Sequence, residues 1–73
     1  LDKKMASKLK PVVNNPQVWE VLKSHLQELT QETHQALVAA QSEQEMFRNQ
    51  GKAILLGQLL SLKDVINNFE KNN

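Results

Sequence analysis

The chain has 73 residues, a formal net charge of +1, 40% hydrophobic residues, only 4% aromatic residues and no cysteine. A chain of this length forms one domain at most and buries only about 60% of the surface that its unfolded form exposes, so it is marginally stable on its own. The lack of cysteine excludes disulfides and thiolate metal sites, and two histidines cannot build a zinc site alone. We therefore expect no metal or cofactor, and we expect stability to come from helix packing and oligomerisation.

Residues 1–15 are predicted to form a flexible basic arm. They show no sustained apolar period, and Pro11 is unfavourable inside a helix. Such an arm should be dispensable for folding. Met5-Ala6-Ser7 is typical of a natural start, which would make residues 1–4 a remnant of an expression vector. The residues that would contact nucleic acid, weakly and in a salt-sensitive way, are Lys3, Lys4, Lys8 and Lys10.

A first long helix is predicted over residues 16–40. Asn15 is a favourable N-cap, and Pro16 suits the first helical position because its missing N–H would have no partner there. Steps of three and four then separate the members of a coiled-coil-like seam. The seam consists of Trp19, Leu22, Leu26, Leu29, Thr33, Ala36 and Ala40. We expect Trp19 to close the open end of a hairpin; its alternative role is an interface anchor.

The seam lapses after Ala40, and two interpretations compete. The helix could continue, because neither glycine nor proline stops it. A turn is favoured by Ser42 and Glu45, which have the spacing of a capping box that starts a new helix. An unbroken helix over residues 16–70 would also be about 80 Å long without a continuous seam to bury. The sequence therefore predicts a break between Ala40 and Ser42.

A second helix is predicted over residues 43–69. Its main stripe repeats at four, three, four and three residues and consists of Leu55, Leu59, Leu62, Ile66 and Phe69. Ile54, Leu56 and Leu60 widen this stripe beyond what one partner helix covers. Gly57 lies among these leucines, which predicts close approach of another helix backbone. Antiparallel to the first helix, with Trp19 near Leu62 and Ile66, this helix would complete a two-helix hairpin region over residues 16–73.

The polar residues do not form a recognisable catalytic site. His25, Glu28 and Glu32 share a helix face, but this spacing is equally that of an ordinary solvated surface. No serine has a nearby base, and there is no glycine-rich phosphate loop or metal-binding spacing. We expect a protein that is not an enzyme. The longest apolar run, residues 53–56, is too short to cross a membrane, and the lysines at the start are not followed by the apolar region of a signal peptide.

Residues 15–63 resemble short helical proteins of tailed bacteriophages. The shared features are a proline and a tryptophan that open one helix, a short acidic turn, and Gln50-Gly51 followed by leucines. These leucines are Leu55, Leu56, Leu59, Leu60 and Leu62. The chain departs from the pattern in lacking a proline after the last of them. The resemblance implies a phage accessory protein, located in the cytoplasm of the host cell or within a virion.

Together these features predict an all-α protein: an antiparallel helical hairpin that self-associates into a four-helix bundle, most simply as a dimer. The expected function is a non-catalytic interaction module, a structural or assembly accessory of a phage. The alternatives are an inhibitor of a host enzyme or of a nucleic-acid-binding protein, and a weak DNA-binding accessory. The expected partners are a second copy of the chain, phage structural proteins or a host protein. No membrane contact is expected, and nucleic acid is a partner only in the last alternative. The predicted interface consists of Trp19, Leu22, Leu26, Leu29, Ile54, Leu55, Leu56, Gly57, Leu59, Leu60, Leu62, Ile66 and Phe69.

Overall fold

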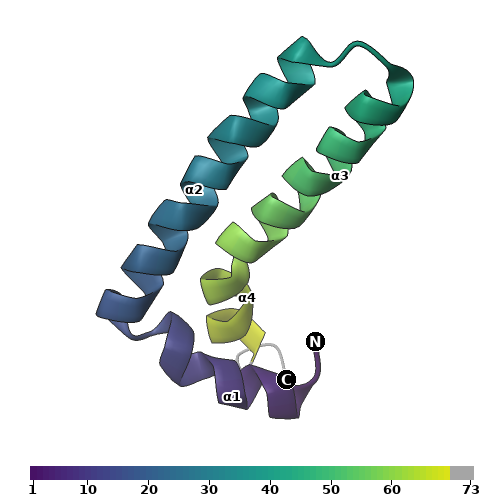
Figure 1. Cartoon of the computed structure of the whole chain (residues 1–73). Coiled ribbons are helices and arrows are strands. Elements are labelled where there is room, and N and C mark those ends of the chain that lie inside the picture. The colour runs from purple at the N-terminus through teal and green to yellow at the C-terminus, as the bar shows by residue number, and fades with distance from the viewer. Residues whose placement is uncertain (70–73) are drawn as a thin grey trace.

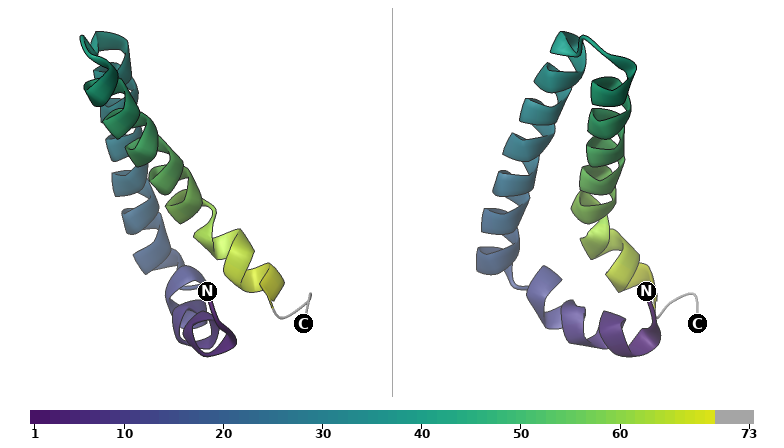
Figure 2. Two further views of the ribbon diagram at one scale, coloured as in Figure 1. Left: turned by 90° about the vertical axis from the view of Figure 1, so that its right-hand side faces the viewer. Right: turned by 45° about the vertical axis from the view of Figure 1, so that its right-hand side comes forward.

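The computed structural model describes residues 1–69, and the all-α class predicted from the sequence is confirmed across them (Figure 1). Residues 1–69 form four helices, where the sequence predicted two. They are α1 (Lys3–Val13), α2 (Pro16–Ala39), α3 (Glu43–Leu60) and α4 (Leu62–Phe69). α2 and α3 run antiparallel beside each other, and α1 crosses the end of this pair next to α4 (Figures 1 and 2). The remainder of the predicted hairpin region, residues 70–73, lies outside the described residues.

Helix α1 corrects the prediction of a flexible arm. Asp2 caps it: its carboxylate accepts a hydrogen bond of 2.8 Å from the backbone N–H of Met5. Pro11 lacks the N–H that would donate to the carbonyl of Ser7, and α1 ends two residues later at Val13. One face of α1 packs against the rest of the chain and buries Ala6 and Val13. Their packing contributes stability that local sequence patterns do not reveal.

Polar side chains cap both helices of the central pair. Asn15 Oδ1 accepts hydrogen bonds of 3.1 and 3.3 Å from the N–H groups of Gln17 and Val18 at the start of α2. At the start of α3, Ser42 Oγ accepts from the N–H of Glu45 at 3.1 Å. In return, Glu45 Oε2 accepts from the N–H of Gln41 at 3.1 Å. The chain is therefore broken between α2 and α3 where the capping signal indicated, and α2 ends at Ala39, one residue earlier than predicted.

The second predicted helix, residues 43–69, is interrupted at Ser61. The N–H of Ser61 still donates to the carbonyl of Gly57 at 3.1 Å, and the Ser61 carbonyl accepts from the N–H of Val65 at 3.0 Å. Helical bonding therefore resumes directly after the interruption, and α4 continues α3 with a change of direction (Figure 2). The bend brings α4 onto α1.

The most deeply buried side chains gather where α1, α2 and α4 meet. Val13, Trp19 and Ile66 form this cluster, with Leu9 and Leu62 packed against it. The predicted contact of Trp19 with the end of the second helical segment is thus confirmed, as is its role in the core. Next to the cluster, the side-chain amides of Asn14 and Asn67 exchange hydrogen bonds of 2.8 and 3.0 Å. This amide pair ties the α1–α2 junction to α4.

Candidate interaction surface

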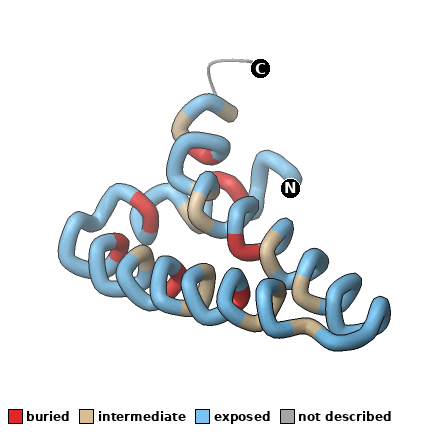
Figure 3. Tube along the Cα trace, turned by 90° about the horizontal axis from the view of Figure 1, so that it is seen from above, coloured by how far each residue is buried: buried red, intermediate tan, exposed pale blue. Residues whose placement is uncertain are grey.

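The structure divides the predicted interface residues into a core and a surface. Trp19, Leu26, Leu56 and Ile66 are buried within the chain, so they stabilise the single copy (Figure 3). Leu29, Leu60, Leu62 and Phe69 are half-buried. Leu22, Ile54, Leu55 and Leu59 are exposed, although they belong to the apolar stripes. Only the half-buried and exposed residues are available to a partner.

A groove runs between α2 and α3 on one side of the pair. Its cavity has a volume of about 410 Å³. α2 lines it with Leu29, Glu32, Thr33 and Ala36, and α3 with Asn49, Lys52, Leu55 and Leu56. Thr33 is buried at its base, with its hydroxyl donating to the carbonyl of Leu29 at 2.8 Å. The groove is therefore apolar along its middle and charged at two points.

The apolar character extends along both helices toward α1. Leu22 lies two turns before Leu29 on α2, and Leu59 lies one turn after Leu55 on α3, so each shares a helix face with a groove residue. Val18 precedes Leu22 by one further turn and is 47% exposed. We call this surface the groove face. It consists of Val18, Leu22, Leu29 and Ala36 of α2 and Leu55 and Leu59 of α3.

The two sides of the groove face carry opposite charge. On the α2 side, Glu32 lines the groove and Glu28 lies one turn before it. On the α3 side, Lys52 lines the groove and Arg48 lies one turn before it. All four side chains are exposed. We call Glu28 and Glu32 the acidic α2 edge. We call Arg48 and Lys52, which lie in the same α3 stripe as Leu55 and Leu59, the basic α3 edge.

No other helix among the described residues covers the groove face. α1 packs on α4 and on the start of α2 but not on α3, and α4 packs on α1 and on the end of α3. Leu55 consequently remains 55% exposed and Leu22 40% exposed. Fully burying a leucine is worth about 1.5–3 kcal/mol, so the face leaves several kcal/mol of hydrophobic stabilisation unused.

The overall dimensions agree with an incompletely covered core. The radius of gyration is 14.9 Å, against about 11 Å expected for a compact chain of this length. The accessible surface is 5656 Å², against about 4,600 Å² for a folded monomer of the same mass. Residues 70–73 supply at most about 700 Å² of it, judged from the surface of an unfolded chain. A surplus on the order of several hundred Å² therefore belongs to the described residues.

Two exposed residues of the predicted interface, Ile54 and Gly57, lie away from the groove face. Ile54 is about 160° around α3 from the buried Leu56, and Gly57 lies on the opposite side of Leu56 from Leu55. A Cβ atom added to Gly57 would meet nothing within 4 Å. The prediction that another helix backbone approaches Gly57 closely is therefore wrong for the helices of the same chain. A partner bound to the groove face would not reach Gly57.

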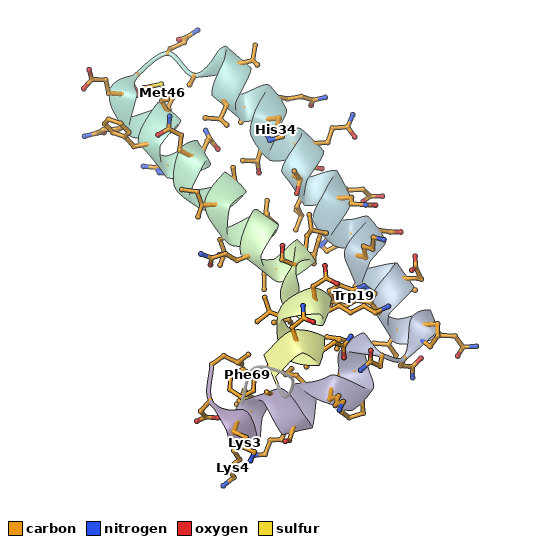
Figure 4. All side chains as sticks on the ribbon, turned by 180° about the vertical axis from the view of Figure 1, so that it is seen from behind. Lys3, Lys4, Trp19, His34, Met46 and Phe69 are labelled. Carbon is orange, nitrogen blue, oxygen red and sulfur yellow. The ribbon has the colours of Figure 1, made fainter. Side chains whose placement is uncertain are left out.

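The lysines of the predicted arm lie on a helix. Lys3, Lys4, Lys8 and Lys10 are all exposed. Lys4 and Lys8 lie on the side of α1 away from its buried Ala6 and Val13, whereas Lys3 and Lys10 flank the buried side. Figure 4 shows Lys3 and Lys4 projecting outward, whereas Trp19 points in between α2 and α4. α1 contains no acidic residue; Asp2 only caps it. The sequence pattern placed these lysines in a flexible arm and did not predict this basic helix.

The other polar candidates do not form a cluster of catalytic or metal-binding character. His25, Glu28 and Glu32 are exposed on α2, and of these three only Glu32 lines the groove. Within residues 1–69, no group of three or more His, Asp or Glu side chains is placed to hold a metal ion. None of the helices in this part of the chain is long and apolar enough to cross a membrane.

Comparison of the chain with protein-family models, with curated proteins and with solved structures gave no match.

Proposed function

We propose that the protein is a non-catalytic interaction module that functions by self-association through its groove face. The observation that carries this proposal is the uncovered groove between α2 and α3, where Leu55 is 55% exposed next to the buried Leu56. A second helical pair placed over the groove would complete a four-helix bundle. Two-fold dimers are the commonest arrangement for such self-complementary surfaces.

Two neighbouring residues provide a matched test of this proposal. Leu55 lies in the groove, whereas Ile54, 64% exposed, points away from it. Leu55→Asp should abolish self-association measured by sedimentation velocity, because an aspartate would be buried in the interface without a partner. Ile54→Asp should leave the association unchanged. Equal effects of the two substitutions, or none, would contradict the assignment of the groove face.

The resemblance to bacteriophage accessory proteins supports a more specific proposal, that the module serves phage particle structure or assembly. Affinity capture with the tagged protein from phage-infected cells, read by mass spectrometry, tests it. Enrichment of capsid, tail or scaffold proteins over the Leu55→Asp variant would support it. Enrichment of a host enzyme instead would favour the inhibitor alternative.

A second candidate function rests on the exposed lysines of α1. Four exposed lysines on a helix without acidic residues form an electrostatic surface suited to phosphate contacts. Fluorescence anisotropy with a labelled DNA duplex should then show binding at low salt that weakens steeply as salt rises. Replacing Lys3, Lys4 and Lys8 with glutamine should remove it. Absence of binding by the unaltered protein at low salt would dismiss this function.

A further inference from the structure

We infer that the occupant of the groove face is a second copy of this chain in one particular orientation, with the two-fold axis parallel to α2 and α3. This inference rests on the proposed function and specifies its geometry. In this arrangement, α2 of each copy lies over α3 of the other, and the α2–α3 turns of both copies are at the same end of the bundle. The contact that defines it is Glu32 of one copy against Lys52 of the other.

Symmetry limits the ways in which two groove faces can meet. A two-fold axis parallel to the helices places α2 of one copy over α3 of the other, and it leaves the height of every residue, its position along the helix axes, unchanged. A two-fold axis across the helices, in the plane between the copies, places α2 over α2 and α3 over α3 and reverses the heights. A face-to-face dimer with helices aligned as in a four-helix bundle therefore has these two choices.

The charged edges distinguish between the two choices. An axis along the helices brings the acidic α2 edge, Glu28 and Glu32, against the basic α3 edge, Arg48 and Lys52, twice in each dimer. An axis across the helices that is centred on the groove brings acidic edge against acidic edge and basic edge against basic edge. Juxtaposed like charges disfavour an association, whereas opposite charges set its orientation. The structure therefore favours the axis along the helices.

The heights of the groove residues agree with this orientation. Glu32 and Lys52 of one chain both line the groove, and each is about ten residues from the α2–α3 turn, so in the antiparallel pair they lie at about the same level along the helices. Leu29 and Leu55 line it together in the same way, one turn closer to α1. Because an axis along the helices preserves height, Glu32 of one copy meets Lys52 of the other, and Leu29 meets Leu55. One register thus satisfies the charge pairs and the apolar pairs together.

A charge exchange between copies tests this geometry. Glu32→Lys sets two lysine side chains against each other at both contacts of its own dimer, and Lys52→Glu likewise sets two glutamates against each other. Each variant alone should therefore dimerise roughly ten- to hundredfold more weakly than the unaltered chain, given two reversed pairs in each interface. In the heterodimer of the two variants, both contacts pair a lysine with a glutamate, whereas both contacts of each homodimer pair like charges. Heterodimers should therefore form above the statistical half, and less so at high salt.

The mixture also removes an ambiguity within each chain. Glu32 and Lys52 of one chain face each other across the groove, so each substitution changes this internal contact as well. The internal contact is the same in homodimers and heterodimers, and it cancels when they are compared. The control replaces Glu32→Lys by Glu20→Lys, an exposed residue about 120° away around α2 with the same change of charge. Mixed with Lys52→Glu, this control should show much less heterodimer preference.

Native mass spectrometry of isotopically distinguished variants measures the three species directly. Preferential heterodimers for Glu32→Lys with Lys52→Glu, but not for the control mixture, are the expected result. A dimeric unaltered protein whose variants mix statistically would overturn the orientation and leave the proposed self-association intact. A folded monomeric protein at every concentration would overturn both. The double variant Glu32→Lys/Lys52→Glu should dimerise close to the level of the unaltered chain.

Discussion

Replacing Ile66 with alanine should remove a large part of the stability of this protein. Ile66 is 1% exposed and packs with Val13 and Trp19 where α1, α2 and α4 meet. The substitution deletes three carbon groups, worth about 2.4 kcal/mol at about 0.8 kcal/mol each. The cavity left behind adds to this, so we expect a total loss of about 3–4 kcal/mol. A chain of this length has a free energy of unfolding of about 4–11 kcal/mol, so the variant should be close to its stability limit.

Urea denaturation followed by circular dichroism, at one fixed protein concentration, measures this loss. Val65→Ala is the matched control, because Val65 is the preceding residue on α4 and is 47% exposed. It should cost less than about 1 kcal/mol. Similar losses for the two variants, or a loss below about 1 kcal/mol for Ile66→Ala, would refute the packing of α4 against α1 and α2.

Three further outcomes follow from the helices themselves. Deleting residues 1–13 should lower the melting temperature, because it uncovers the cluster that α1 helps to bury. An unchanged melting temperature would show instead that these residues are dispensable for folding. Ser42→Ala should cost about 1 kcal/mol in denaturation experiments through loss of the α3 cap, whereas Ser24→Ala, exposed within α2, should cost almost nothing. Gly51→Ala and Gly57→Ala should each stabilise the protein by about 0.5–1 kcal/mol, since nothing lies within 4 Å of the added methyl group. Weaker dimerisation of the Gly57 variant would place Gly57 in an interface.

The features predicted correctly from the sequence are those determined by local chemistry. Asn15 and Ser42 each cap a helix in the structure, because a side-chain oxygen two or three residues before an unpaired N–H can satisfy it without help from distant residues. The placement of Trp19 near Leu62 and Ile66 followed from helix period and an antiparallel turn. Such features require only spacing and geometry within one or two helices.

The features missed depend on contacts between distant parts of the chain. α1 forms despite Pro11 because Ala6 and Val13 are buried against other helices, although Asp2 and the spacing of Ala6, Leu9 and Val13 were available as signals. The bend at Ser61 has no glycine or proline to announce it. It lets α4 reach α1, where Asn67 pairs with Asn14. These two asparagines are 53 residues apart, so no local pattern predicts their contact.

The division of the apolar stripe into core and groove was likewise beyond the sequence pattern. Leu55 and Leu56 are adjacent leucines with the same propensity, yet Leu56 is 8% exposed and Leu55 is 55% exposed. Their roles depend on how α3 is rotated against α2. A difference of one position, about 100° around the helix, separates a core residue from a candidate interface residue.

The central claim, self-association through the groove face, is tested most directly by the mass of the unaltered protein in solution. Sedimentation equilibrium over a range of protein concentrations measures it, with thermal melting recorded on the same samples. We expect twice the mass of one chain at high concentration and a melting temperature that rises with concentration, as mass action requires of an assembly coupled to folding. A folded species with the mass of one chain and a constant melting temperature at all concentrations would contradict the claim.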